Sequence, residues 1–154
     1  EVNEDGSCNN YSNVTVDGLT ISNKIGNGSK GIWILANSGA AANLNNITIK
    51  NCIVRNIGWI SNNLSSIPAN SGIVANAIKV DGGNAAYAIT NVKIDNNEVN
   101  NCATGWGEAV TVTGNVNGFS VSGNHICCSS NPSDSESAHG PEYQIIHAIE
   151  FITI

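Results

Sequence analysis

Charged residues are scarce in this chain of 154 residues, and basic residues are the scarcest. Asp, Glu, Lys and Arg make up 12% of it, against roughly 25% in a typical globular protein. Its 6 Lys and Arg stand against 12 Asp and Glu, which gives a net charge of -6. Nothing in the sequence forms the basic patch that displaces counterions from phosphates. We therefore expect no nucleic-acid partner.

Other features are missing as well. No apolar run approaches the roughly 18 residues of a membrane-spanning helix, so we expect no membrane span. The 5 cysteines include no Cys-x-x-Cys pair, which argues against a zinc or redox motif. The chain has no Met and starts at Glu1. We expect either that a signal peptide has been removed or that the chain is an excised piece.

Asn is heavily over-used, and Ser, Thr and Gly are abundant. The hydrophobic content of 41% is sufficient for a modest core. A folded chain with so little charge must hydrate its surface with amides and hydroxyls, which is common in extracellular β-rich proteins. We therefore expect a secreted, extracellular protein.

An eight-residue pattern recurs four times without gaps. Its first, third and eighth positions are apolar, and its fifth is Gly or Asn. The copies are VTVDGLTI from Val14, ITIKNCIV from Ile47, VKIDNNEV from Val92 and FSVSGNHI from Phe119. Alternating apolar residues predict a half-buried strand, and Gly and Asn tolerate the left-handed backbone of a sharp bend. The sixth position (Leu19, Cys52, Asn97, Asn124) then points inward, where stacked Asn side chains can bond along the axis.

A second pattern falls between the copies of the first. Its segments are GIWIL from Gly31, AIKVD from Ala77, AVTVT from Ala109 and AIEFI from Ala148. Each coil is then two strands joined at a bend, a variable loop and a third strand, with the extra residues leaving as loops at 56–76 and 127–147.

These patterns predict an all-β fold: a right-handed parallel β-helix, or β-solenoid, of about four coils of three strands. Residues 1–13 form a polar lead-in or cap, and residues 14–154 form the β-helix, with coils starting near 14, 47, 92 and 119. The far end is expected to be uncapped, because the chain stops inside an apolar strand. The alternative is an antiparallel β-sandwich, which gives no reason for two interleaved patterns to recur in fixed order.

The stretch GWGEAVTVTGNVNGFSVSGNHI at 105–126, together with the repeat over 14–154, resembles the pectin-lyase-like superfamily of secreted parallel β-helix repeat proteins. That superfamily includes polysaccharide lyases as well as adhesins and phage tailspikes, so the shared fold does not fix the reaction. In its lyases, the chemistry lies on the outer face of the third-strand sheet. The resemblance implies that acidic residues there hold calcium, and that a Lys or Arg removes the proton next to a uronate carboxylate.

Stacking the third-strand segments places several polar residues on one outward face. The predicted columns are Trp33, Lys79, Thr111 and Glu150; Leu35, Asp81, Thr113 and Ile152; and Lys30, Asn76, Glu108 and His147. On this basis the candidate catalytic residues are Lys79, Glu108 and His147. Asp81 and Glu108 are the candidate calcium ligands, since carboxylates supply hard oxygen donors. Trp33, as a stacking platform, and Glu150 are the candidate substrate-binding residues.

The alternative is an ordinary solvated strand face with scattered charges, and the sequence favours it, because several Asp on consecutive coils are missing. A second outward column, Asp17, Lys50, Asp95 and Ser122, alternates in sign and is interpreted as structural.

Two further expectations concern Cys and His. A disulfide from Cys102 to Cys127 or Cys128 would pin a loop. His125 is expected on an exposed strand position, because its spacing from His139 and His147 matches no metal template.

Three functions are compatible with these features. The first is a secreted carbohydrate-associated β-helix module whose partner is a polysaccharide or glycan, with or without lyase activity on uronate-containing polymers. The second is a structural or adhesive protein that self-associates through its uncapped β-helix end into filaments or oligomers. The third is a non-catalytic glycan-binding module.

Overall fold

The computed structural model describes residues 12–26, 28–36, 43–58, 74–83, 88–102, 104, 107–127 and 146–148. For residues 25 and 146–148 it describes the backbone alone. The predicted cap at 1–13 therefore lies almost wholly outside the described residues.

The described residues form three parallel four-stranded sheets and no helix. The first sheet contains β1 (Thr15–Asp17), β4 (Leu44–Lys50), β7 (Ile89–Asp95) and β10 (Val116–Ser122). The second contains β2 (Thr20–Ile25), β5 (Ile53–Gly58), β8 (Glu98–Asn100) and β11 (His125–Cys127). The third contains β3 (Lys30–Leu35), β6 (Asn76–Asp81), β9 (Val110–Thr113) and β12 (Ile146–Ala148).

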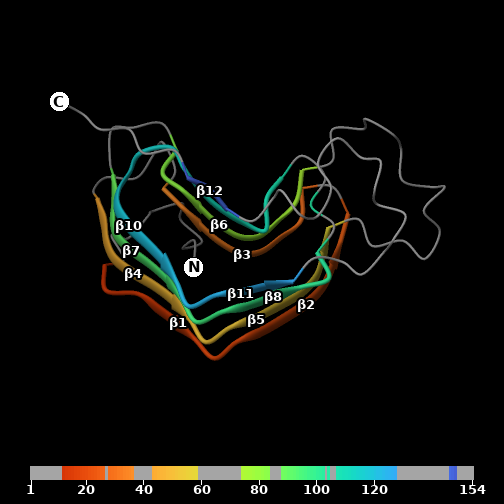
Figure 1. Cartoon of the computed structure of the whole chain (residues 1–154). Coiled ribbons are helices and arrows are strands. Elements are labelled where there is room, and N and C mark those ends of the chain that lie inside the picture. The colour runs from red at the N-terminus through yellow and green to blue at the C-terminus, as the bar shows by residue number, and fades with distance from the viewer. Residues whose placement is uncertain are drawn as a thin grey trace, which may run out of the picture.

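The chain visits the three sheets in the same order four times, and we call each visit a rung. Rung 1 is β1–β3, rung 2 is β4–β6, rung 3 is β7–β9 and rung 4 is β10–β12. Figure 1 shows the sheets as three sides around a shared interior, with the third sheet bowed toward the other two. The predicted all-β class and its four repeats of three strands are confirmed, and the stacked parallel sheets are compatible with a β-solenoid.

The gap-free alignment predicted the register of the first two sheets. Thr15 lies opposite Thr48, and Val92 lies opposite both Ile47 and Phe119. The second sheet keeps the same offsets. Because side chains alternate between the two faces of a strand, this agreement fixes which residues point inward.

In the third sheet, the register is confirmed for β3, β6 and β9 and is wrong for β12. The sequence pattern placed Ile149 opposite Val110, whereas Ile146 lies there and His147 lies opposite Thr111. Ile-His-Ala at 146–148 and Ile-Glu-Phe at 149–151 share the same apolar–polar–apolar alternation. The pattern alone therefore fits both registers.

Loop lengths also differ from the prediction at one corner. The extra residues were expected only between second and third strands, as between β5 and β6. However, β3 ends at Leu35 and β4 begins at Leu44, while β9 ends at Thr113 and β10 begins at Val116. The connection from third to first strand therefore varies in length as well.

Left-handed residues recur every five positions along the first two strands of each rung and set the bends there. Three columns of stacked residues have positive φ: Asn13, Asn46, Asn91 and Gly118; Gly18, Asn51, Asn96 and Gly123; and Asn23, Asn56 and Asn101. The sequence pattern identified only the middle column. Since Asn and Gly are the residues that tolerate this conformation, the backbone accounts for the eight Asn residues that have positive φ.

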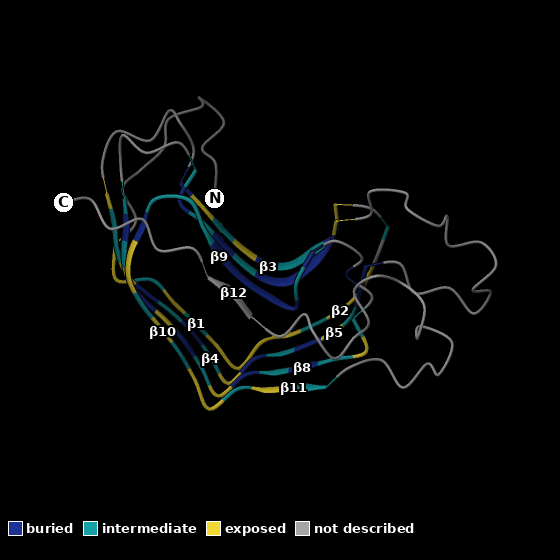
Figure 2. Cartoon of the chain, turned by 45° about the horizontal axis from the view of Figure 1, so that its top comes forward, coloured by how far each residue is buried: buried dark blue, intermediate teal, exposed yellow. Residues whose placement is uncertain are grey.

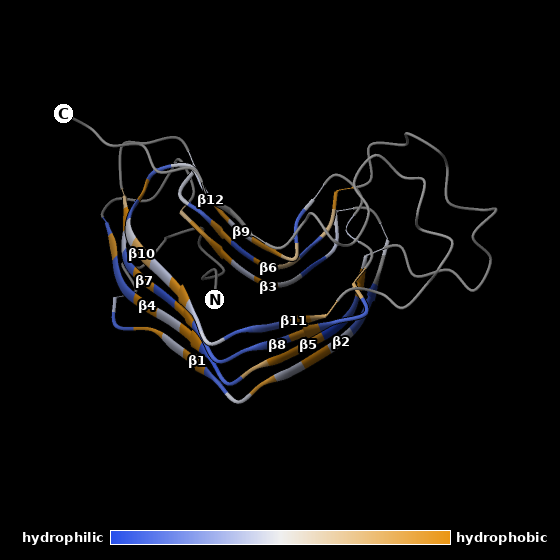
Figure 3. Cartoon of the chain, in the orientation of Figure 1, coloured by the Kyte–Doolittle hydropathy of each residue, from blue (hydrophilic) through white to orange (hydrophobic). Residues whose placement is uncertain are grey.

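The two outer columns of Asn also bond along the stack. The Nδ2 of Asn46 donates to Oδ1 of Asn13 at 2.8 Å, and Asn91 donates to Asn46 at 2.9 Å. In the third column, Asn56 donates to Asn23 at 2.8 Å. Figure 3 shows the resulting hydrophilic bends running beside apolar strand segments.

Inside the stack, a shorter Asn ladder lies where it was predicted. Asn97 is 1% exposed. Its Nδ2 donates to the carbonyl of Ile49 at 3.0 Å and to Oδ1 of Asn124 at 2.9 Å, and its Oδ1 accepts from the backbone N–H of Cys52 at 3.0 Å. Every polar group of this side chain is paired, which a buried amide requires.

The core consists mainly of inward-facing aliphatic side chains of rungs 2 and 3. Ile49 and Ile94 are fully buried, whereas their counterparts Val16 and Val121 in rungs 1 and 4 are only partly buried. Figure 2 shows this gradient from buried middle strands to exposed outer ones. Leu19 has the predicted inward register but is 52% exposed, because no described strand lies beyond rung 1.

We expect Asn97→Ala to lower the free energy of unfolding by about 2–4 kcal/mol, because it leaves buried backbone groups without partners. Urea denaturation measures the change. Asn117→Ala, at an exposed position of β10, is the control and should change the value by less than about 0.5 kcal/mol. Equal effects of the two substitutions would contradict a structural role for the inner ladder.

Candidate functional site

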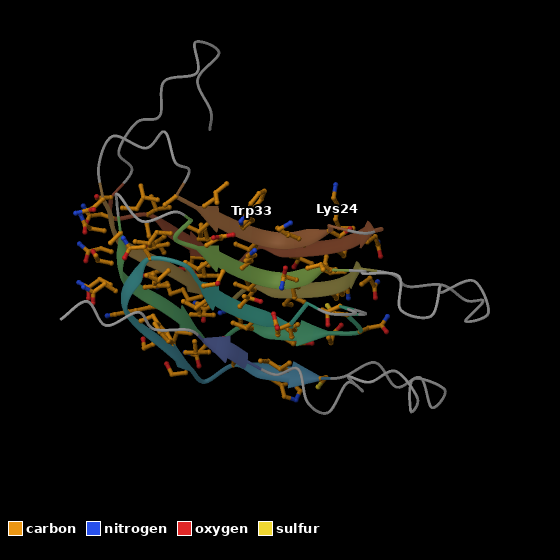
Figure 4. All side chains as sticks on the ribbon, turned by 90° about the horizontal axis from the view of Figure 1, so that it is seen from above. Lys24 and Trp33 are labelled. Atoms are coloured by element: carbon orange, nitrogen blue, oxygen red, sulfur yellow. The ribbon has the colours of Figure 1, made fainter. Side chains whose placement is uncertain are left out.

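The outer surface of the third sheet brings together most of the residues predicted to carry function. We call it the third-sheet face, and it comprises Lys30, Trp33, Leu35, Asn76, Lys79, Asp81, Glu108, Thr111 and Thr113. Parallel pairing places Lys79 between Trp33 and Thr111, and Asp81 between Leu35 and Thr113. Neighbouring strands are about 4.8 Å apart, so these side chains form short columns. In Figure 4 this sheet faces the viewer, with Trp33 on its outermost strand.

Lys79 and Asp81 form an ion pair on β6. Their Nζ and Oδ2 atoms are 2.9 Å apart, and both side chains are about one-fifth exposed, at 21%. The pair arises because residues two apart on a strand share a face. The other oxygen of Asp81, Oδ1, accepts the backbone N–H of Gly83 at 3.0 Å. The carboxylate is therefore held from two directions.

A second polar group joins Asn76, Thr111 and Glu108. The Nδ2 of Asn76 donates to Oγ1 of Thr111 at 2.7 Å and to the carbonyl of Glu108 at 3.2 Å. The Thr111 hydroxyl in turn donates to Oε2 of Glu108 at 3.0 Å. These bonds fix the orientation of the Asn76 amide, because exchanging its nitrogen and oxygen would set two acceptors against each other.

Asn76 retains an unsatisfied acceptor. The residue is 2% exposed, and its Oδ1 has no hydrogen-bond partner among the described residues. A buried amide oxygen without a donor is unfavourable by about 1–3 kcal/mol.

Trp33 presents the largest aromatic surface among the described residues of this face. Its side chain is 48% exposed. The Nζ of Lys30 lies 4.5 Å from the ring centroid and also donates to the carbonyl of Gly28 at 3.0 Å. The ammonium group therefore braces the indole by a cation–π contact. The ring is held in place while much of its surface stays open.

The structure brings some predicted site residues together and not others. Lys79 and Asp81 are in contact, while Glu108 belongs to the Asn76–Thr111 group. His147 was expected in the Glu108 column, but its backbone lies opposite Thr111, three positions further along. Glu150 lies outside the described residues.

Calcium binding remains a prediction. Within the described part of the chain, no three His, Cys, Asp or Glu residues are grouped closely enough to hold a metal ion. Asp81 already pairs with Lys79 and with the N–H of Gly83. A cation at Asp81 would have to replace these partners.

Sequence reasoning gave no role to Asn76 or Thr111. Both were placed in the correct columns, but only the side-chain contacts show that they form one hydrogen-bonded group. The sequence signal that could have indicated this contact is the Asn at position 76, at the start of a mostly buried strand, together with the Thr at position 111 on the next rung.

The charged column of the first sheet makes structural contacts. Lys50 Nζ is 3.3 Å from Asp17 Oδ2, and Ser122 donates to Asp95 at 2.8 Å. The Asn51 side chain donates to Asp17 at 2.8 Å. That hydrogen bond and the neighbouring Lys50 hold the pKa of Asp17 below its usual value.

The predicted disulfide of Cys102 is absent, because Cys52, Cys102 and Cys127 are all free thiols. Cys102 lies on the inward side, where burial raises its pKa and a backbone hydrogen bond with Ile57 opposes the rise in part. Cys127 lies outward, opposite Asn100, with its Sγ 3.1 Å from Nε2 of His125. His125 is exposed on β11, as expected.

The described residues include no helix long and apolar enough to cross a membrane. Comparison of the chain with models of protein families, with curated proteins and with solved structures gave no match. The resemblance to the pectin-lyase-like superfamily therefore stays a prediction.

We expect the three described thiols to be alkylated at different rates in the folded protein. Cys127 should react first, because its side chain lies on the outward side of β11, at the end of the second sheet among the described strands. Cys102 should react more slowly, since its raised pKa lowers the thiolate fraction at about pH 8. Cys52 should react slowest, because it is buried. Timed iodoacetamide labelling with peptide mapping measures the order, and the denatured protein is the control. Equal rates in the folded state would contradict the placement of Cys127 on the outside, Cys102 on the inward side and Cys52 in the core.

Proposed function

We propose that this protein is a secreted, carbohydrate-binding β-solenoid module, and that its ligand is a polysaccharide that lies across the third-sheet face. The observation that carries the proposal is Trp33, an aromatic side chain 48% exposed and held in place by Lys30. A braced aromatic ring loses little conformational freedom on binding, and it offers a flat surface to the apolar face of a sugar.

The polar groups beside Trp33 suit a ligand rich in hydroxyls. Lys79 and Asp81 provide donors and acceptors on the next rung. Ligand sites commonly combine an apolar platform with a few placed polar groups. Polymers that contain uronates remain the expected class, since Lys30 and Lys79 supply positive charge for a carboxylate.

The contacts of Lys79 favour binding over elimination. A residue that removes a proton from the substrate must itself be unprotonated. The Nζ of Lys79 is instead engaged by the carboxylate of Asp81, 2.9 Å away. An ammonium group in this position can bind a uronate carboxylate but cannot accept a proton.

The finer description of the fold is part of the same proposal. We assign a right-handed parallel β-helix of the pectin-lyase-like kind. The support is that each pair of neighbouring parallel strands, such as β1 and β4, is joined by a crossover through the other two sheets. Crossovers between parallel strands of one sheet are almost always right-handed.

Trp33→Ala should weaken polysaccharide binding about 10- to 30-fold, equivalent to ~1.4–2 kcal/mol, because an exposed aromatic platform is lost. A panel of neutral and uronate-containing polysaccharides, screened by affinity electrophoresis and followed by calorimetry, measures the effect. Leu19→Ala is the matched control, since it also removes an exposed large apolar side chain, but away from this face. Failure of the unmodified protein to bind any polysaccharide would refute the proposal.

We expect no release of unsaturated uronates from pectate, alginate or hyaluronan, with or without added calcium. Absorbance of the unsaturated product measures this directly. Lys79→Ala and Asp81→Ala should behave like the unmodified protein in this assay, while both weaken binding. Calcium-dependent product that disappears in Lys79→Ala would establish the lyase instead.

A further inference from the structure

Lys24 occupies a position that belongs to the interior. In the five-residue period, the residue after each left-handed Asn points inward, and Lys24 follows Asn23. Its partner in the neighbouring strand is Ile57, which is fully buried. Continuing the register by one rung leads to Cys102, which packs against the core. A charged residue therefore heads a column that is otherwise apolar.

The Lys24 side chain avoids burial because it lies on the outermost described rung. It is exposed, and it makes no ion pair or hydrogen bond with the described residues. Figure 4 shows it extending beyond β2, away from the rest of the stack. It therefore stands where a further rung would have to pack.

Apart from Lys24, the edge formed by β1, β2 and β3 is suited to packing against a further rung. Each of these strands lies at the end of its sheet among the described residues. An edge strand offers unpaired backbone groups to another chain. The inward-facing Val16 and Ile21 are only partly buried, and Leu19 is largely exposed. Among the described residues, apolar surface and backbone groups without a neighbouring strand therefore lie together at this edge.

We propose that Lys24 prevents a second copy of this chain from stacking on the β1–β2–β3 edge. A rung placed on β2 would enclose the ammonium group above Ile57 and beside Ile21. No carboxylate is present in that inward column to pair with it. Burial of an unpaired charge is strongly unfavourable. The apolar edge is therefore kept from continuing the parallel sheets into a filament.

Lys24→Ile tests the proposal, because it gives this position the residue found at Ile57. The unmodified protein should remain monomeric at this edge. The variant should associate as its concentration rises, reaching at least twice the monomer mass in sedimentation and light scattering. Lys93→Ile is the matched control, since Lys93 is exposed on β7 and points outward; it should stay monomeric.

Two further variants locate the association. Lys24→Glu keeps a charge at the inward position and should stay monomeric. Adding Ile21→Lys to Lys24→Ile restores a charge on the same strand and should return the variant to monomer. Circular dichroism confirms that each variant is folded. A folded Lys24→Ile that stays monomeric, a double variant that still associates, or association of the unmodified protein with β2 in the interface would each overturn the proposal.

Discussion

In-register stacking of parallel strands depends on one backbone constraint, the left-handed residue at every fifth position. Each such residue has a similar positive φ in every rung, so the strands of the first two sheets face each other without offset. Asn is suited to this position twice over. It tolerates positive φ, and its amide bonds to the same amide one rung away, as Asn46 does to Asn13. The bends and the ladders are therefore one feature of the chain.

The third sheet is where this regularity is relaxed. It follows the variable connections, and its outer face combines Trp33, the Lys79–Asp81 pair and the Asn76–Thr111–Glu108 group. Elsewhere on the stack, outward polar residues such as Asp17 and Lys50 bond to neighbouring rungs and are satisfied by them. On the third-sheet face, Asn76 keeps an acceptor that no described residue fills.

A stack of rungs has two ends, and the strands of an end rung can pair with a further rung from another chain. The same alternation that buries Ile49 and Ile94 leaves Val16 partly open on rung 1. Lys24 places a single charge at an inward position of the end rung. The charge stays hydrated at the edge, whereas its burial inside a longer stack would be unfavourable. The proposed binding function would benefit from that charge, since an end-to-end assembly would confine the Trp33 edge between copies.

The sequence alone determined the rungs, their offsets and the inward side of each strand, because apolar alternation and bend residues are local signals. It could not decide the register of β12, where 146–148 and 149–151 carry the same alternation. Nor could it show that Cys102 faces the core while Cys127 points outward from β11, or that Asn76 and Thr111 form one group. Those facts depend on contacts between residues far apart in the chain. Only tertiary packing decides which side chain meets which.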